Sequence, residues 1–206
     1  MEKMRQRNTV LYTQRVEIVE SYGERRDCAD QNIAKFISAC GYLPVPLPNN
    51  RELSVQIFLC LKPSGIILTG GNSLVKYGGN ALERDETEYE LIRLSIIEGV
   101  PVYGFCRGMQ VILDYFGCKL ENVGNHVATR HRLQGMWEGE EVNSYHKQAC
   151  VQVAESLRKL AWTDDGVAEA VVHKEYPILA TMWHPEREKP YKQEDIARVR
   201  KLFGRK

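Results

Sequence analysis

The sequence predicts an α/β fold in which helices flank a central, mostly parallel β-sheet. Two observations support this. Strand-like and helix-like segments alternate through the first half of the chain, and the apolar run at residues 64–71 (SGIILTGG) ends in two glycines. Such a run is typical of a central parallel strand covered on both faces, and β-α alternation is typical of a parallel sheet. We find no repeat, low-complexity segment or linker, so we expect residues 1–206 to form a single domain.

The individual elements follow from periodicity and from the residues that end them. Apolar residues at helical spacing, followed by a glycine, predict helices that stop at Gly41, Gly99 and Gly117. Prolines in LPVPLP (43–48) predict a strand at a sheet edge. In chain order we expect strands at 8–14, 43–48, 64–71 and 101–105, helices at 33–40, 51–62, 84–98 and 107–116, further strands within 140–145, 166–173 and 176–183, and a last helix around 196–203.

Composition excludes several classes of function. Hydrophobic residues make up 43% of the 206 residues, charged residues 27%, and the formal net charge is +1. A charge so near neutral gives no electrostatic reason to expect nucleic acid or an anionic membrane as partner. The chain lacks a long apolar run and an apolar leader, so we expect a cytoplasmic protein. The sequence leaves the oligomeric state open.

The six cysteines show no CxxC pair or other close metal-ligand spacing, so we predict no metal and no cofactor. In a reducing cytosol most of them are expected to be small buried hydrophobes. His126, His131 and His173 have no assignable partner in the sequence, and we interpret them as core or solvated residues.

Cys106 differs from the other cysteines because of its surroundings. It lies in GFCRG (104–108), between an apolar strand and an amphipathic helix. A nucleophile at a sharp strand-to-helix turn needs small neighbours two residues away on either side, and the helix N-terminus favours a thiolate. The alternative is a buried cysteine in a glycine-flanked turn. We favour a catalytic nucleophile.

A base and two oxyanion donors can be proposed for this nucleophile. His184 follows the strand at 176–183, and Glu186 is two residues on, where it can orient the imidazole. Alone, this segment could be a surface turn with an incidental histidine. The backbone N–H groups of Gly71 and Arg107 are the natural donors to a developing oxyanion, although a glycine pair after a strand is a weak signal by itself.

Three motifs in this order, TGGN (69–72), GFCRGMQ (104–110) and MWHPER (182–187), resemble a class I glutamine amidotransferase domain. The closer resemblance is to free-standing γ-glutamyl hydrolases, which include the γ-glutamyl-GABA hydrolases. YTQR (12–15), RDETE (84–88) and VNSYHKQ (142–148) extend it over nearly the whole chain. The resemblance implies a flavodoxin-like three-layer sandwich, a Cys-His-Glu triad formed by Cys106, His184 and Glu186, and a γ-glutamyl thioester that water hydrolyses.

The resemblance also implies substrate-binding residues. Gln110 matches a glutamine that lies along the γ-glutamyl group, although it could equally face a neighbouring strand. Residues 143–146 match the family segment that holds the α-amino and α-carboxylate groups of the glutamyl group. The alternative is an ordinary polar strand end. The implied substrate-binding residues are Gly70, Gln110, Asn143, Ser144, Tyr145 and His146.

Two charged segments have competing interpretations. Asp85 and Glu88 match the family's acidic helix start, and they also satisfy a capping box, which we favour. Arg15, Arg25 and Arg26 follow the first strand and could pair with an anionic leaving group. The alternative for these arginines is a solvated helix entry with Asp27 as its N-cap.

The segments YGERRD, YGGN and VNSYH resemble most the enzymes that release a cytidine diphosphate amidate from its γ-glutamyl form in bacterial capsule phosphoramidate synthesis. A γ-glutamyl-GABA hydrolase and a glutaminase subunit that supplies ammonia to a separate synthetase are the alternatives. A binding protein on the same fold is a third, and the intact triad argues against it. In each enzymatic case the partner is a small γ-glutamyl molecule.

Overall fold

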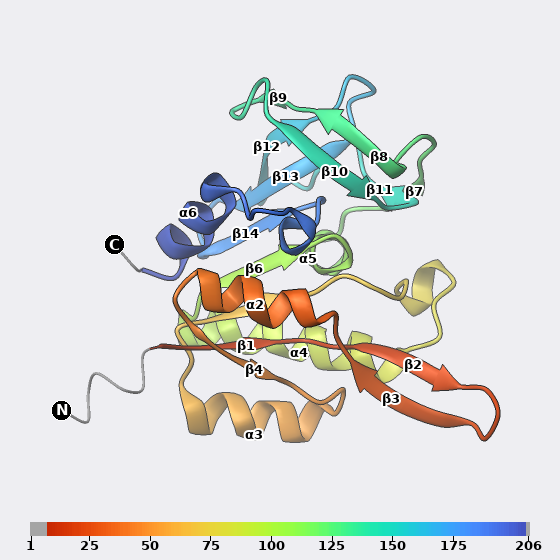
Figure 1. The fold of residues 1–206 in the computed structure, drawn as a ribbon, viewed down its shortest axis with the longest axis vertical. Helices are drawn as coiled ribbons and strands as arrows, with labels where there is room; N and C mark the ends of the chain where they lie inside the picture. The colour runs from red at the N-terminus through yellow and green to blue at the C-terminus, as the bar shows by residue number, and fades with distance from the viewer. Residues whose placement is uncertain (1–7, 205–206) are drawn as a thin grey trace.

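An eight-stranded sheet runs through the computed structural model, which describes residues 8–204 (Figure 1). Five strands are mutually parallel, and three more continue the sheet as antiparallel neighbours. In spatial order the strands are β4 (Leu43–Pro46), β1 (Thr9–Tyr12), β5 (Gly65–Leu68), β6 (Val102–Phe105), β14 (Ile178–Thr181), β13 (Ala168–His173), β12 (Leu157–Trp162) and β9 (Gln134–Gly135).

The order of the parallel strands identifies the arrangement. Numbered along the chain, they lie in the order 2-1-3-4-5, which is the flavodoxin-like form of a doubly wound sheet. The predicted α/β fold with a mostly parallel sheet is confirmed, and β4 lies at the edge as its prolines required. In this topology a ligand crevice is expected beyond the carboxyl ends of β1 and β5, where the strand order reverses.

Helices cover both faces of the sheet because its central strands are apolar on both sides. Neighbouring residues such as Ile66 and Ile67 are both fully buried but belong to opposite apolar cores. One core contains α2 (Gln31–Ala39) and α6 (Gln193–Leu202), and the other contains α3 (Arg51–Leu61), α4 (Leu82–Glu98) and α5 (Arg107–Tyr115). The short 3-10 turns are η2 (Val75–Tyr77) and η3 (Pro185–Arg187).

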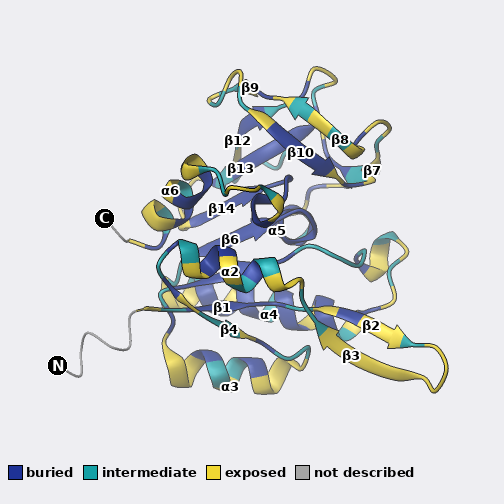
Figure 2. Ribbon diagram, in the orientation of Figure 1, coloured by how far each residue is buried: buried dark blue, intermediate teal, exposed yellow. Residues whose placement is uncertain are grey.

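Three small antiparallel pairs project from this framework. They are β2 (Arg15–Val19) with β3 (Glu24–Cys28), β8 (Val127–Arg132) with β10 (Glu141–Tyr145), and β7 (Glu121–Asn122) with β11 (Gln148–Ala149). The β2–β3 hairpin extends away from the main sheet and is largely exposed (Figures 1 and 2).

The hairpin corrects the interpretation of residues 22–27 as a solvated helix entry. These residues form the turn and most of β3, and Asp27 accepts hydrogen bonds from Asn49. The N-cap of α2 is Asp30, whose side chain accepts from the Asn32 amide. The sequence did not reveal the hairpin because β3 has no buried apolar face and therefore no alternating pattern.

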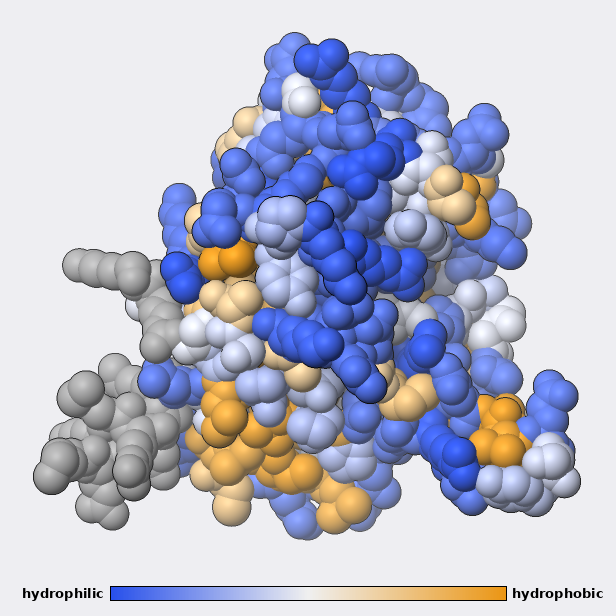
Figure 3. Space-filling view, viewed as in Figure 1, coloured by the Kyte–Doolittle hydropathy of each residue, from blue (hydrophilic) through white to orange (hydrophobic). Residues whose placement is uncertain are grey.

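The surface in the orientation of Figure 3 is mostly hydrophilic, with an apolar patch in the region of α3. Leu53 and Leu59 of α3 are exposed. Among the described residues, no helix combines the length and the apolar character needed to cross a bilayer.

Candidate active site

Cys106 occupies a strained turn between β6 and α5. Its backbone has φ 52° and ψ −111°, in a region that residues with a side chain adopt only under constraint. A Cβ on Gly104 would lie 2.6 Å from the carbonyl oxygen of Gly108, and one on Gly108 would lie 2.0 Å from the carbonyl oxygen of Leu68. The two glycines are therefore required by packing, as the sequence predicted for a strand-to-helix elbow.

His184 and Glu186 lie beside this elbow at the carboxyl end of β14. The Nδ1 of His184 is 2.7 Å from Oε1 of Glu186, and both side chains are almost fully buried. Cys106 lies close enough to the imidazole to act on its charge. Burial disfavours the imidazolium, but Cys106 and Glu186 outweigh burial and raise the pKa of His184 to about 9. The structure thus brings all three residues of the predicted triad together.

Asn143 fixes the backbone on which His184 is carried. Its Oδ1 accepts from the His184 amide at 2.9 Å, and its Nδ2 donates to the His184 carbonyl at 2.9 Å and to Glu188 at 2.9 Å. The Asn143 side chain is buried and therefore already engaged in holding the histidine.

The residues after Asn143 alternate in direction, as expected for a β-strand. Tyr145 packs edge-on against the His184 ring, with a centroid distance of 5.7 Å. Ser144 and His146 instead face away from this ring: Ser144 Oγ donates to the His126 carbonyl, and His146 contacts Glu169. The predicted substrate-binding segment is therefore divided between two sides of β10.

Gly70 and Gly71 lie against the same site at the end of β5. A Cβ on Gly70 would be 2.8 Å from Cε1 of His184 and 3.5 Å from Cβ of Cys106. Gly71 has φ +87°, which favours glycine. The carbonyls of Thr69, Gly70 and Gly71 all accept hydrogen bonds from the Arg84 guanidinium.

A buried charge network lies beneath the elbow and was missed in the sequence. Arg84 pairs with Glu88, and Arg107 pairs with both Glu88 and Asp85. Burial is the largest influence on the pKa of Glu88 and acts to raise it, but the two guanidiniums hold it below its usual range. An Arg and a Glu four residues apart in RDETE were the available signal.

This network overturns the capping-box interpretation of Asp85 and Glu88. Helix α4 begins at Leu82, its N-cap Ala81 makes no side-chain cap, and Asp85 accepts instead from the Val75 amide and from Arg107. Because the helix starts earlier than predicted, both carboxylates lie inside it on the buried face.

Gln110 lies one turn into α5 and is buried. Its Nε2 donates to the carbonyl of Gln148 in β11 at 2.8 Å, so its amide faces a neighbouring strand. Its backbone N–H closes the first turn of the helix on the Cys106 carbonyl.

The three predicted anion-binding arginines are separated by the hairpin. Arg15, at its base, lines a small cavity of about 40 Å³ together with Gly70, Gly71 and His184. Arg25 bonds to Glu83 and to the Asn80 carbonyl, and Arg26 pairs with Glu24, both on exposed parts of the hairpin. Only Arg15 of the three lines this cavity.

Two of the three histidines that had no assignable partner in the sequence have hydrogen-bond partners in the structure. His126 is buried and contacts Asp165, Glu169 and His146. His173 accepts at Nδ1 from two backbone amides, those of Glu175 and Tyr176. Their partners are separated in sequence or are backbone atoms, which residue patterns do not reveal.

A strained cysteine elbow, a buried His–Glu pair and a flavodoxin-like sheet define this site, and the sequence matches the family described as Glutamine amidotransferase class-I over residues 26–199. The chain belongs to this family. It is 33% identical over 181 residues to the γ-glutamyl-CDP-amidate hydrolase of Campylobacter jejuni, covering 85% of this chain and 88% of that protein.

Two further similarities are more distant. The chain is 28% identical over 169 residues to the GMP synthase of Wolinella succinogenes, covering 76% of this chain but only 30% of that enzyme. A solved structure from Thermoplasma acidophilum, provisionally described as one subunit of a GMP synthase, superposes with a TM-score of 0.70 at 18% identity, covering 95% of this chain and 92% of that one. The structural likeness concerns the fold.

Proposed function

We propose that this protein is a cysteine-dependent hydrolase of γ-glutamyl amides. The observation that carries the proposal is the strained Cys106 at φ 52°, next to a buried His184 whose Nδ1 is bound by Glu186. A nucleophile, a base and a group that orients the base form the arrangement used for acyl transfer through a covalent intermediate. The family membership fits this chemistry.

In the first half-reaction the Cys106 sulfur attacks the γ-carbonyl carbon. The C–N bond breaks as the thioester forms, and His184 gives its proton to the departing amine. In the second half-reaction His184 takes a proton from water, which attacks the thioester, and glutamate and the free thiol are released. Glu186 keeps the imidazole oriented and stabilises its protonated form.

Two backbone N–H groups are proposed as oxyanion donors. The Gly70 carbonyl is bound by Arg84, and a trans peptide directs its C=O and the following N–H in opposite directions. The Gly71 N–H therefore points away from Arg84. The Arg107 N–H is the other donor, since it begins the helix directly after the nucleophile, and the buried ion pairs of its side chain hold that turn.

For the substrate we propose a γ-glutamyl amide whose amine side is anionic, of the γ-glutamyl-CDP-amidate type. The 33% identical relative supports this choice, and so does Arg15 in the cavity beside His184. A place in capsule phosphoramidate synthesis would follow from that substrate. A charged hydrogen bond of about 1.5–3 kcal/mol would favour the anionic substrate by roughly ten- to a hundredfold.

The test is glutamate release by the isolated chain from γ-glutamyl-CDP-amidate, γ-glutamyl-GABA and glutamine. Cys106→Ala should abolish it for every substrate. Arg15→Ala should lower kcat/KM selectively for the CDP-amidate, whereas Arg26→Ala, on the exposed hairpin, is the matched control. Equal kcat/KM for the first two substrates would refute the proposed leaving group and leave the γ-glutamyl chemistry standing.

The second candidate is a glutaminase subunit that supplies ammonia to a separate synthetase, which the similarity to a GMP synthase favours. Such a subunit is expected to be nearly inactive alone. Rapid turnover by the isolated chain argues for the hydrolase, and activity that appears only with a synthetase argues for the subunit.

A further inference from the structure

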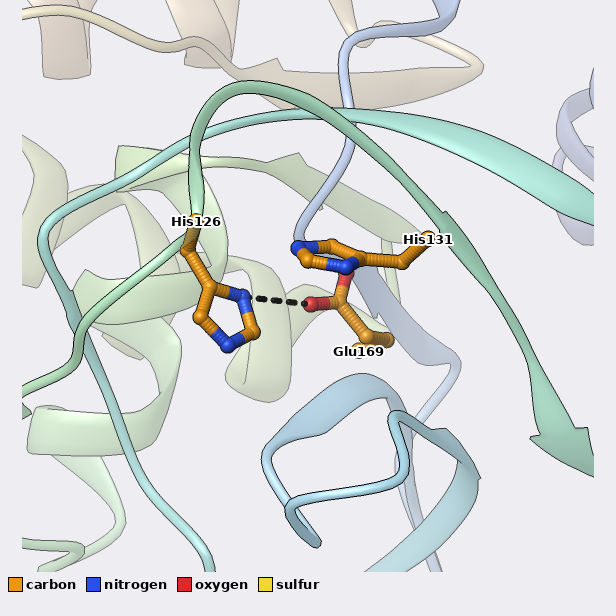
Figure 4. A group of neighbouring side chains, drawn as sticks. All are labelled: His126, His131 and Glu169. Atoms are coloured by element: carbon orange, nitrogen blue, oxygen red, sulfur yellow. Dashed lines mark ion pairs between the residues drawn. The ribbon is translucent and has the colours of Figure 1, made fainter.

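A second group of reactive side chains lies on the other side of β10 from His184. His126, just before β8, His131 within β8 and Glu169 within β13 each direct one ligand-type atom at the others, and these atoms lie within 4.8 Å of one another (Figure 4). His126 and Glu169 are buried, and His131 is half-buried. Glu169 lies far along the chain from the two neighbouring histidines.

The cluster contains buried polar atoms with unused bonding capacity. Among the described residues, Oε2 of Glu169 and Nε2 of His131 have no hydrogen-bond partner although both are buried. Leaving such atoms unpaired is costly, so native structures usually provide them with a partner, a water or an ion. Both atoms belong to residues of the cluster.

His126 is held as a metal-ligating histidine would be. Its Nε2 lies 2.9 Å from Oδ2 of Asp165, and its Nδ1 lies 3.6 Å from Oε1 of Glu169. If Nε2 carries the proton and donates to Asp165, Nδ1 is an acceptor that faces the cluster. It lies 3.2 Å from Nε2 of His146, a contact that a bound ion would displace. A carboxylate bound to the remote ring nitrogen is the usual support of an imidazole ligand.

Ions could reach the cluster from solvent. A surface cavity of about 310 Å³ is lined by His126, His131 and Asp165, among others. Glu169, at 0% exposure, lies beneath the two histidines. An ion entering from the cavity would therefore find two imidazoles and then a carboxylate.

We propose that His126, His131 and Glu169 bind a divalent transition-metal ion, with zinc the best fit. Two imidazoles disfavour magnesium and calcium, which prefer oxygen ligands, and two histidines with one glutamate are a known zinc donor set. The cavity leaves room for water as a fourth ligand. This differs from the metal-free protein predicted from cysteine spacing, which takes no account of histidines brought together by the fold.

The position of the cluster gives the ion a structural role. The His126 carbonyl accepts from Ser144 Oγ and from the His146 amide, on the strand whose Asn143 holds His184. An ion at His126 would fix the β8–β10 pair against β13 without contacting the reacting groups. We expect metal to raise the unfolding temperature.

Cobalt titration of the chelator-treated full chain tests the proposal. We expect one equivalent of Co²⁺ to bind with visible d–d absorption, without a thiolate charge-transfer band, and to be displaced by Zn²⁺. Cys106→Ala should bind equally well, which distinguishes this site from binding at the Cys106–His184 pair. His131→Gln and Glu169→Gln should each weaken binding at least tenfold, and His173→Gln, a histidine outside the cluster, should not.

His131→Gln is the decisive variant, because His131 is half-buried and its loss should spare the fold, as far-ultraviolet circular dichroism would verify. Three results would each overturn the proposal: no saturable Co²⁺ or Zn²⁺ binding, undiminished binding by folded His131→Gln, or loss of binding in Cys106→Ala. None of these depends on the identity of the γ-glutamyl substrate.

Discussion

Replacement of Glu186 by glutamine separates the charge of the orienting residue from its geometry. The glutamine carbonyl can still accept from Nδ1–H of His184, so the ring should keep its place, but the negative charge is removed. Glu186 is one of the groups that raise the pKa of His184 to about 9. Its removal must therefore lower that pKa.

The magnitude follows from the contact. The Nδ1–Oε1 distance is 2.7 Å, and the two side chains are only 4% and 2% exposed, so solvent screening is weak. A hydrogen bond to a charged group contributes about 1.5–3 kcal/mol. At about 1.4 kcal/mol per pKa unit, the His184 pKa should fall by about one to two units. The same loss in the transition state corresponds to a roughly ten- to hundredfold lower kcat.

The assay is kcat/KM against pH with a chromogenic γ-glutamyl anilide. His184 must be protonated to expel the amine, so activity should fall as pH rises through about 9 in the wild type. This alkaline limb should move to lower pH in Glu186→Gln. The apparent values belong to the coupled Cys106–His184 pair. Glu188→Gln, which removes a nearby carboxylate bonded to Asn143 and Arg130, is the control. An unmoved limb in Glu186→Gln, or an equal shift in Glu188→Gln, would refute the reasoning.

Three further predictions concern the support of the site. Glu88→Ala should lower the free energy of unfolding by about 3–5 kcal/mol in urea titrations, because Arg84 and Arg107 lose a buried partner. Glu90→Ala breaks a pair with exposed Arg93 and should lower the free energy of unfolding far less. Gly108→Ala should lower the melting temperature strongly because its Cβ meets the Leu68 carbonyl. Gly124→Ala is the control, since a Cβ there meets nothing within 4 Å. A similar fall in melting temperature for the two variants would contradict the packing argument. Asn143→Ala should lower kcat at least tenfold with a smaller change in KM, as steady-state kinetics would measure, because it frees the His184 backbone; unchanged kcat would exclude this positioning role.

Much of the fold was encoded in local patterns. The apolar run ending at Gly70–Gly71, the helical stripes and the prolines of β4 each depend on near neighbours in the chain, and the structure has these elements close to the expected positions. The glycines around Cys106 likewise indicated the elbow, because a sharp strand-to-helix turn needs small neighbours. The close approach of the Leu68 carbonyl to Gly108 comes from the neighbouring strand β5.

Elements without an apolar face could not be predicted from these local patterns. The β2–β3 hairpin is stabilised by backbone pairing rather than by a buried stripe, so the sequence pattern did not indicate it and left a helix entry at residues 22–27 as an alternative. The separation of Arg15 from Arg25 and Arg26 followed from this hairpin. The alternation of side chains along β10 also places Asn143 toward His184 and Ser144 toward His126.

The sequence by itself determined the α/β class, the elbow and the identity of the residues that meet there, because these depend on periodicity, small residues and short-range turns. Tertiary structure alone decided the long-range partners of buried charge: Arg107 beside Glu88, and the histidines beside Glu169. A buried carboxylate needs a cation or a hydrogen-bond donor beside it, and the fold decides which of these groups lies within reach. The number of residues between two such groups in the sequence does not predict the distance between them in the fold.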